Sequence, residues 1–329
     1  MEFRTKLHPF SLPFEIDLKD SLFFIGSCFA ENVSRRFSSK KFGVTSNPFG
    51  TLYNPLSISL ALNHIANKKG YGSSTQIKNQ GIYYSWLHHG SLGALSSEEL
   101  LKKTNDINLE NFEKLKKCTY LFITLGSAWA YKYKKTGLIT ANCHKIAADQ
   151  FETVFISCDE IVKSFEDSIQ AIKKINHRVK IVLTVSPVRH IRDGLIENNR
   201  SKAELIRAVH KLCDTHNLCY YLPVYEWVID DLRDYRFYEK DLVHPNNMAQ
   251  DYIWENIGDL FFAEHTKSDL KRLNNFISGL EHKAFNPNSE EHISFLKNLL
   301  NKGKKLEKEL NINLQVELLE IETRLKIIK

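Results

Sequence analysis

The sequence contains no uninterrupted apolar run of the roughly 18 residues that a membrane-spanning helix needs. The segment 1–20 also lacks the apolar stretch of a signal peptide. None of its six cysteines forms a C-x-x-C pair with another. We therefore expect a cytoplasmic protein without a membrane span, whose cysteines are free thiols that are mostly buried as small apolar side chains.

A concentrated basic segment is missing as well. Lys and Arg number 45 against 39 Asp and Glu, a net charge of +6, and the densest lysines, at 302–308, are interleaved with glutamates. A nucleic-acid-binding protein usually carries a sharper basic stripe, so we expect no nucleic-acid partner. With 329 residues, 43% of them hydrophobic, the chain has the composition of an ordinary globular protein of one or two domains.

Four common catalytic and cofactor-binding motifs do not occur. The sequence has no phosphate-binding G-x-x-x-x-G-K-[ST], no G-x-G-x-x-G after a strand, no G-x-S-x-G and no H-E-x-x-H. Its His88-His89 and Cys143-His144 pairs are adjacent in sequence, and adjacent side chains rarely converge on one zinc ion. We therefore expect neither a cofactor nor a metal.

Short apolar runs alternate with amphipathic segments through most of the chain. Runs typical of buried strands lie at 21–25, 120–125, 179–185 and 218–222. Helical patterns are found at 29–37, 55–66, 157–174, 201–216 and 246–262. Apolar strands separated by helices predict a parallel sheet covered on both faces, that is, a three-layer α/β/α fold.

Two segments depart from this alternation. Residues 67–117 are rich in glycine and then polar, and we interpret them as an insertion over the strand ends. Beyond residue 265 the composition shifts to Lys, Glu, Asn and Leu with helical spacing. We accordingly divide the chain into an α/β domain, 1–265, and a helical C-terminal appendage, 266–329. The appendage either packs on the core or offers a surface for a protein partner or for self-association.

Candidate catalytic residues follow the predicted strands, where ligands bind in open α/β sheets. Ser27 and Cys28 lie between the first strand and the next helix, where backbone N–H groups lower a thiol pKa and can hold an oxyanion. Downstream, the spacing of Asp241 and His244 allows one loop to hold both side chains. Asp241 can then orient His244 as a general base, so the pattern indicates nucleophilic catalysis.

The segment 25–30, IGSCFA, resembles the signature of the GSCFA family, which is named for its last five letters. The resemblance extends over about residues 5–262. The other stretches that carry it are 47–55 (NPFGTLYNP), 85–89 (SWLHH), 125–129 (LGSAW), 142–145 (NCHK), 186–202 and 241–246. Membership implies the SGNH (GDSL-like) hydrolase superfamily, with its flavodoxin-like sheet and its acyl hydrolase or acyltransferase chemistry. The appendage after residue 266 is not covered.

The resemblance leaves two candidates for the nucleophile. The superfamily places its nucleophile two residues after the glycine of a G-D-S block, which corresponds to Cys28 here. A shift of one residue makes it Ser27, and a third interpretation is a buried cysteine without catalytic function.

The superfamily's oxyanion hole implies further residues. Gly50 matches its glycine, whereas Ala128 stands where its asparagine is expected. Asn142 or Asn47 could replace that asparagine from a neighbouring loop. The missing donor matters because removing one oxyanion donor typically costs about 10²–10³ in rate.

Two further groups of residues are candidates for substrate binding. Arg189, Arg192 and Asp193 follow a predicted strand and can clamp a carboxylate or phosphate, the alternative being an internal salt-bridge network around that loop. His88 and His89, in the insertion, are candidates for the rim of the site. Ser201 is expected to cap a helix N-terminus.

The resulting hypothesis is an acyl hydrolase or acyltransferase that acts on a small-molecule or glycan ester or thioester through a covalent acyl-enzyme. His244, oriented by Asp241, would deprotonate Cys28. The incomplete oxyanion hole leaves open a catalytically inactive module that holds a ligand or partner in the same pocket. An assembly protein that acts through residues 266–329 is the third possibility.

Overall fold

The computed structural model describes residues 5–8 and 10–327. Its backbone divides into two compact units, and each is described by itself. The first unit contains the described residues within 1–9, 21–35 and 44–254, and the second those within 10–20, 36–43 and 255–329. Two short N-terminal segments, 10–20 and 36–43, therefore belong with the C-terminal helices, which the sequence pattern did not indicate.

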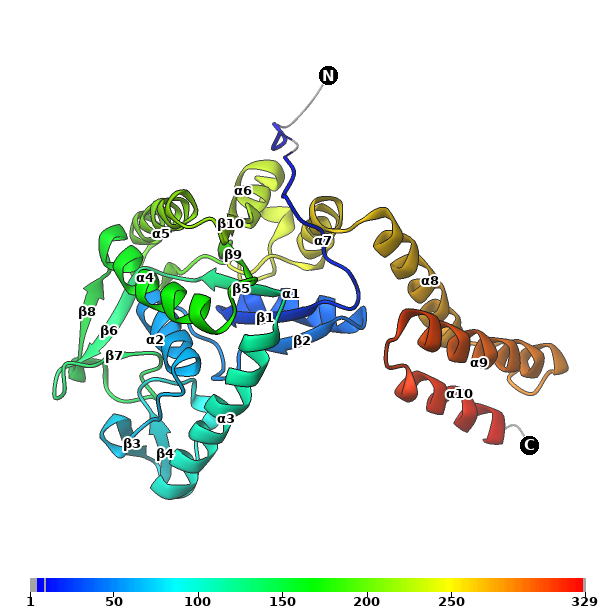
Figure 1. Cartoon of the computed structure of the whole chain (residues 1–329), viewed down its shortest axis with the longest axis horizontal. Helices are drawn as coiled ribbons and strands as arrows, with labels where there is room; N and C mark the ends of the chain where they lie inside the picture. Colours follow the sequence, from blue (N-terminus) through cyan, green and yellow to red (C-terminus); the bar gives the residue numbers. More distant parts are fainter. Residues whose placement is uncertain (1–4, 9, 328–329) are drawn as a thin grey trace. The chain divides into compact units, whose positions relative to one another are not determined.

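A five-stranded parallel sheet forms the centre of the first unit, with the strand order β10-β9-β5-β1-β2 (Figure 1). The strands are β1 (Ser21–Gly26), β2 (Gly43–Ser46), β5 (Tyr120–Leu125), β9 (Lys180–Val185) and β10 (Cys219–Tyr221). All six residues of β5 are buried. Such continuous burial is typical of a parallel strand that is covered on both faces.

Helices flank this sheet (Figure 1). They are α1 (Cys28–Ser39), α2 (Pro55–Ala66), α3 (Ser97–Lys117), α4 (Cys158–Ile175), α5 (Leu195–Thr215), the single turn α6 (Val224–Glu226) and α7 (Asn247–Phe261). Phe23 and Ile25 of β1 point into the core shared with α2, α4 and α5. Leu22 and Phe24 point to the opposite face and are buried too. The predicted α/β fold with a parallel sheet is confirmed.

Local capping explains two of the helix starts. Asn54 accepts a hydrogen bond from the amide of Ser57 at 2.8 Å, and Pro55 occupies the first helical position of α2. Ser157 and Glu160 form a reciprocal capping box before α4. Both starts agree with the sequence prediction. The predicted start of a helix at Ser201 is wrong, because α5 begins six residues earlier.

Two smaller sheets lie outside the central one. Segment 67–117 contains the hairpin of β3 (Gln76–Asn79) and β4 (Ile82–Ser85), followed by α3. A three-stranded sheet, which the sequence analysis missed, has the order β7-β6-β8. Its strands are β6 (Trp129–Tyr133), β7 (Ile139–Thr140) and β8 (Phe151–Phe155).

The second unit contains the C-terminal helices α8 (Glu264–Glu281), α9 (Glu290–Leu310) and α10 (Gln315–Ile327). They share a core of leucines and isoleucines around Phe276. In the described part of the chain, none of the helices is long and apolar enough to cross a membrane.

Gly303 of α9 tests the packing of this core. A Cβ at this position would lie 2.6 Å from Cε2 of Phe276 and 2.7 Å from Cδ2 of Leu318. We expect Gly303→Ala to lower the free energy of unfolding by about 1–2 kcal/mol, because overpacking outweighs the gain in helix propensity. Thermal unfolding followed by circular dichroism measures the change. Asn301→Ala, at an exposed position of the same helix, is the control and should be neutral or slightly stabilising.

Candidate active site

The turn between β1 and α1 is built on a glycine that has no room for a side chain. Gly26 has φ +139°, and a Cβ there would lie 2.2 Å from the carbonyl oxygen of Thr124. Its amide donates to Oδ1 of Asn47 at 2.8 Å. This close approach of β1 to β5 places Ser27 and Cys28 at the carboxyl edge of the sheet.

Ser27 and Cys28 have different surroundings. Ser27 is fully buried, its amide donates to the carbonyl of Thr124 at 3.1 Å, and its hydroxyl has no hydrogen-bond partner among the described residues. Cys28 is partly exposed and lines a cavity of about 370 Å³ that also contains His244. Of the two candidate nucleophiles, only Cys28 borders this cavity.

Asp241 and His244 form a hydrogen-bonded pair on one loop. One carboxylate oxygen of Asp241 accepts the amides of Val243 and His244 at 2.9 and 3.0 Å, and the other lies 2.7 Å from Nδ1 of His244. These hydrogen bonds lower the pKa of Asp241 to about 2, so the carboxylate is charged at neutral pH. Leu242 adopts φ +58°, which tightens the loop.

The imidazole of His244 faces the thiol of Cys28. Its Nε2 lies 4.0 Å from Sγ of Cys28. Since Nδ1 donates its proton to Asp241, Nε2 carries the lone pair in the neutral ring and is directed at the thiol. The structure therefore brings Cys28 together with His244 and Asp241, which lie more than 200 positions further along the chain.

The thiol is not electrostatically activated at rest. Burial raises the pKa of Cys28, while hydrogen bonds from Tyr53 and from the Phe29 amide act in the opposite direction without reversing the shift. The expectation of a lowered thiol pKa at the helix N-terminus is therefore wrong. The desolvation of a partly enclosed sulfur outweighs the few donors at the first turn of α1.

Tyr53 is a site residue that the sequence analysis did not identify. Its hydroxyl lies close enough to the Cys28 thiol for each group to shift the pKa of the other. Burial and the neighbouring thiol raise the pKa of Tyr53 to about 12, so the phenol stays protonated and remains a donor. The carbonyl of Tyr53 accepts the amides of Gly126 and Ser127 at 3.0 and 3.1 Å, which fixes its backbone. The sequence did offer one indication of this role, because Tyr53 lies in the segment 47–55 that carries the family resemblance.

Three predicted binding residues do not line the cavity. The amide of Gly50 donates to the carbonyl of Asn47 at 2.8 Å, and a Cβ on Gly50 would lie 2.4 Å from that of His89. Asn142 accepts the amide of His144 at 2.8 Å. Nδ1 of His89 accepts the amide of Ser91 at 3.2 Å. These contacts stabilise turns, so they do not support the oxyanion role expected for Gly50 and Asn142 or the rim role expected for His89.

Arg189 does line the cavity. Its guanidinium lies 5.0 and 4.5 Å from the ring centroids of Tyr235 and Tyr238. Its amide donates to the carbonyl of Val243 at 3.3 Å, which connects the segment after β9 to the loop that carries His244.

A fully buried lysine lies at the ends of two central strands. Nζ of Lys202 donates to the carbonyls of Gly126 and Ser186, both at 2.7 Å. Burial lowers the pKa of Lys202 to about 7. The hydroxyl of the adjacent Ser201 accepts the amide of Ala128 at 2.7 Å, so Ser201 is no helix cap. Both side chains come from α5 and hold the loops after β5 and β9.

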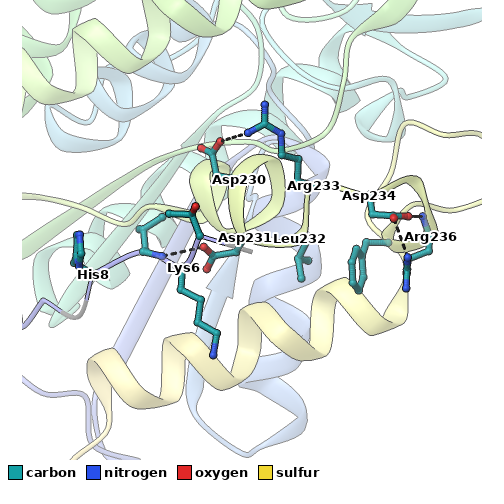
Figure 2. A pocket seen from close by; sticks show the side chains of 11 residues that line it. Lys6, His8, Asp230, Asp231, Leu232, Arg233, Asp234 and Arg236 are labelled. Carbon is teal, nitrogen blue, oxygen red and sulfur yellow. Dashed lines mark hydrogen bonds and ion pairs between the residues drawn. The ribbon is translucent and has the colours of Figure 1, made fainter. Parts of the chain in front are cut away.

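A second, larger cavity lies beside residues 5–8 and 230–237 (Figure 2) and measures about 900 Å³. Its charged groups are largely occupied by neighbours, as Figure 2 shows for Asp234 and Arg236, which are 3.0 Å apart. Asp231 accepts the amide of Leu7 at 2.9 Å. This cavity lacks Cys28 and His244, so we place the candidate active site in the smaller one. The described residues contain no cluster of three His, Cys, Asp or Glu side chains that could hold a metal ion.

Comparison with known families agrees with the signature at the turn. Residues 21–257 match the GSCFA family, and residues 268–327 match a second family described as GSCFA domain protein, C-terminal domain. The chain therefore belongs to the GSCFA family. The second match covers the appendage that the sequence resemblance had left uncovered. A comparison with curated proteins finds no match.

Lys202 offers a test of how the edge of the sheet is held. We expect Lys202→Met to lower the free energy of unfolding by about 2–4 kcal/mol, because two buried carbonyls lose their donor. Chemical denaturation measures the loss. Lys211→Met on the same helix is the control, since Lys211 is exposed and pairs with Asp159 at the surface; it should change stability by less than about 1 kcal/mol. Equal effects of the two substitutions would contradict the bracing role of Lys202.

Proposed function

We propose that this protein is an acyl hydrolase or acyltransferase of the SGNH type that forms a covalent acyl-enzyme at Cys28. The observation that carries the proposal is the arrangement of Cys28 Sγ, 4.0 Å from His244 Nε2, with Asp241 2.7 Å from Nδ1 of the same ring. A general base must lie near the proton it removes, and this geometry is commonly looser before substrate binds. The order of nucleophile, aspartate and histidine along the chain is also that of the superfamily.

The reaction begins when Sγ of Cys28 attacks the carbonyl carbon of an ester or thioester and Nε2 of His244 takes the thiol proton. A carbon–sulfur bond forms, and the carbonyl electrons move to the oxygen. His244 then gives its proton to the leaving alcohol or thiol as that bond breaks. Water or an acceptor hydroxyl, deprotonated by His244, attacks the acyl-enzyme and releases the acyl group, restoring the thiol.

Three donors near Cys28 support stabilisation of the oxyanion. Two are the amides of Cys28 and Phe29 at the first turn of α1, which act to lower the pKa of the thiol. The third is the hydroxyl of Tyr53, which stays protonated. We assign to this phenol the place that the superfamily gives to an asparagine, because Ala128 carries no donor side chain and its amide is taken by Ser201.

A binding module is the second candidate. The raised pKa of Cys28 favours it, because the resting thiol is neutral and a weak nucleophile. In this alternative the cavity holds a small-molecule or glycan ligand without turning it over.

Substitutions at the two candidate nucleophiles and the base test the proposal. We expect Cys28→Ser to lose most hydrolysis of a 4-nitrophenyl ester or thioester, and His244→Ala to lose about 10²–10⁴-fold. Ser27→Ala should remain within a few-fold of the parent, since Ser27 does not border the cavity. Mass spectrometry of the quenched reaction should show an acyl adduct on Cys28. If Ser27→Ala is inactive and Cys28→Ser remains active, Ser27 is the nucleophile. If the parent protein hydrolyses the esters no faster than buffer alone does, the binding module is favoured.

Alkylation of Cys28 should follow the direction of its pKa. Because burial raises this pKa, iodoacetamide should modify Cys28 slowly near pH 6 and faster as the pH rises and the thiolate forms. Fast labelling that stays constant from pH 6 to pH 9 would show a preformed thiolate instead. Peptide mass spectrometry measures the rate at Cys28 separately from those at the other cysteines.

Tyr53→Phe tests the phenol as an oxyanion donor. Removing the hydroxyl should lower kcat by about 10²–10³-fold with a much smaller change in KM. The reason is that the proposed hydrogen bond from the hydroxyl to the substrate oxygen strengthens as that oxygen becomes negatively charged in the transition state. Tyr133→Phe, another partly buried tyrosine that does not line the cavity, is the control and should leave kcat within a few-fold. Equal kcat values for Tyr53→Phe and the parent would remove Tyr53 from the oxyanion hole.

A further inference from the structure

Two arginines line the cavity of Cys28 without a carboxylate partner. Arg189 and Arg192 both follow β9 and border this cavity. In the part of the chain that the structure describes, neither of them forms an ion pair. The internal salt-bridge network considered from the sequence is therefore not what holds them.

Aromatic rings hold these arginines instead. The guanidinium of Arg189 lies 5.0 Å from the ring centroid of Tyr235 and 4.5 Å from that of Tyr238, and the guanidinium of Arg192 lies 5.3 Å from that of Tyr131. Stacking on a ring uses the flat face of a guanidinium and leaves N–H groups on its edge for a ligand. The arginines are thus positioned without being neutralised.

The remaining cavity residues do not cancel this charge. Asp193 is the one carboxylate that lines the cavity, against two arginines. Burial lowers the pKa of His190 to about 4, so this ring is neutral at physiological pH. The Asp241 carboxylate is charged but does not line the cavity, and its oxygens are hydrogen-bonded within its own loop. Among the charged side chains that line the cavity, arginines therefore outnumber carboxylates two to one.

We infer that the acyl donor of this site carries an anionic group, a carboxylate or a phosphate, that pairs with Arg189 and Arg192 while its carbonyl reaches Cys28. Planar guanidinium groups bind both anions through paired N–H donors. The inference rests on the proposed function, because it names the substrate class of the same site. The anion can belong to the acyl group or to the leaving group, and these two sources can be separated by experiment.

Three acyl donors distinguish an anion on the acyl group from an anion on the leaving group. They are 4-nitrophenyl acetate, which is neutral, mono-4-nitrophenyl glutarate, with a carboxylate on the acyl group, and acetyl phosphate, with a phosphate leaving group. After division by the rate in buffer, we expect kcat/KM of at least one anionic donor to exceed that of the neutral one by about tenfold. The preferred donor identifies which side carries the anion. Equal values for all three donors would overturn the inference while leaving the acyl hydrolase intact.

Matched variants show whether the arginines cause the preference. Arg192→Gln and Arg189→Gln should remove most of it, and Arg189→Lys, which keeps the charge but loses the planar fork, should retain part of it. Arg178→Gln is the control, since Arg178 is exposed and does not line the cavity. A preference that survives both glutamine substitutions would contradict the assignment.

A second measurement does not depend on turnover. Iodoacetate and iodoacetamide alkylate the same thiol but differ in charge, so their rate ratio at Cys28 reports the potential beside the sulfur. We expect iodoacetate to be favoured about fivefold more at Cys28 than at the thiol of glutathione, and this factor to fall in Arg192→Gln and at high salt. A ratio equal to that of glutathione overturns the inference. A protein without hydrolase activity still gives this ratio, so failure of the proposed function is distinguishable.

Discussion

The candidate active site depends on one buried amine. Lys202 of α5 donates to the carbonyls of Gly126 and Ser186, which directly follow β5 and β9. The chain after Gly126 leads into β6, whose Trp129 and Tyr131 line the cavity, and the chain after Ser186 carries Arg189 and Arg192, which also line it. Because regular strand pairing ends near these carbonyls, the Lys202 amine, supported by the Ser201 hydroxyl and by the bond from the Ser186 amide to the Leu125 carbonyl, links the segments that carry these cavity residues.

The proposed nucleophile and its proposed base lie in unlike environments. Cys28 is enclosed enough for burial to raise its pKa, whereas the loop of Asp241 and His244 is half-exposed and hydrogen-bonded to itself. The charged aspartate thus remains solvated, and burial favours the neutral thiol. In the proposed mechanism, proton transfer to His244 and attack on the carbonyl would then occur together, which differs from a preformed thiolate–imidazolium pair.

Much of the α/β unit could be predicted from the sequence, because its strands are continuous apolar runs and its helices begin at recognisable caps such as Asn54 and Ser157. The sheet of β6, β7 and β8 could not, since its short strands are only partly buried and pair across loops. The same holds within the site. Cys28, Asp241 and His244 stand out by residue type and position, whereas the roles of Tyr53 and Lys202 depend on which groups their side chains reach in three dimensions.

The enclosure of the Cys28 thiol has a consequence for its expected reactivity toward oxidants. Peroxides oxidise the thiolate and react slowly with the protonated sulfur. A cysteine whose pKa is raised by burial spends little time in the vulnerable form at neutral pH. Under the proposed mechanism, in which the thiolate forms as substrate is attacked, Cys28 would therefore remain mostly in the form that peroxides attack slowly.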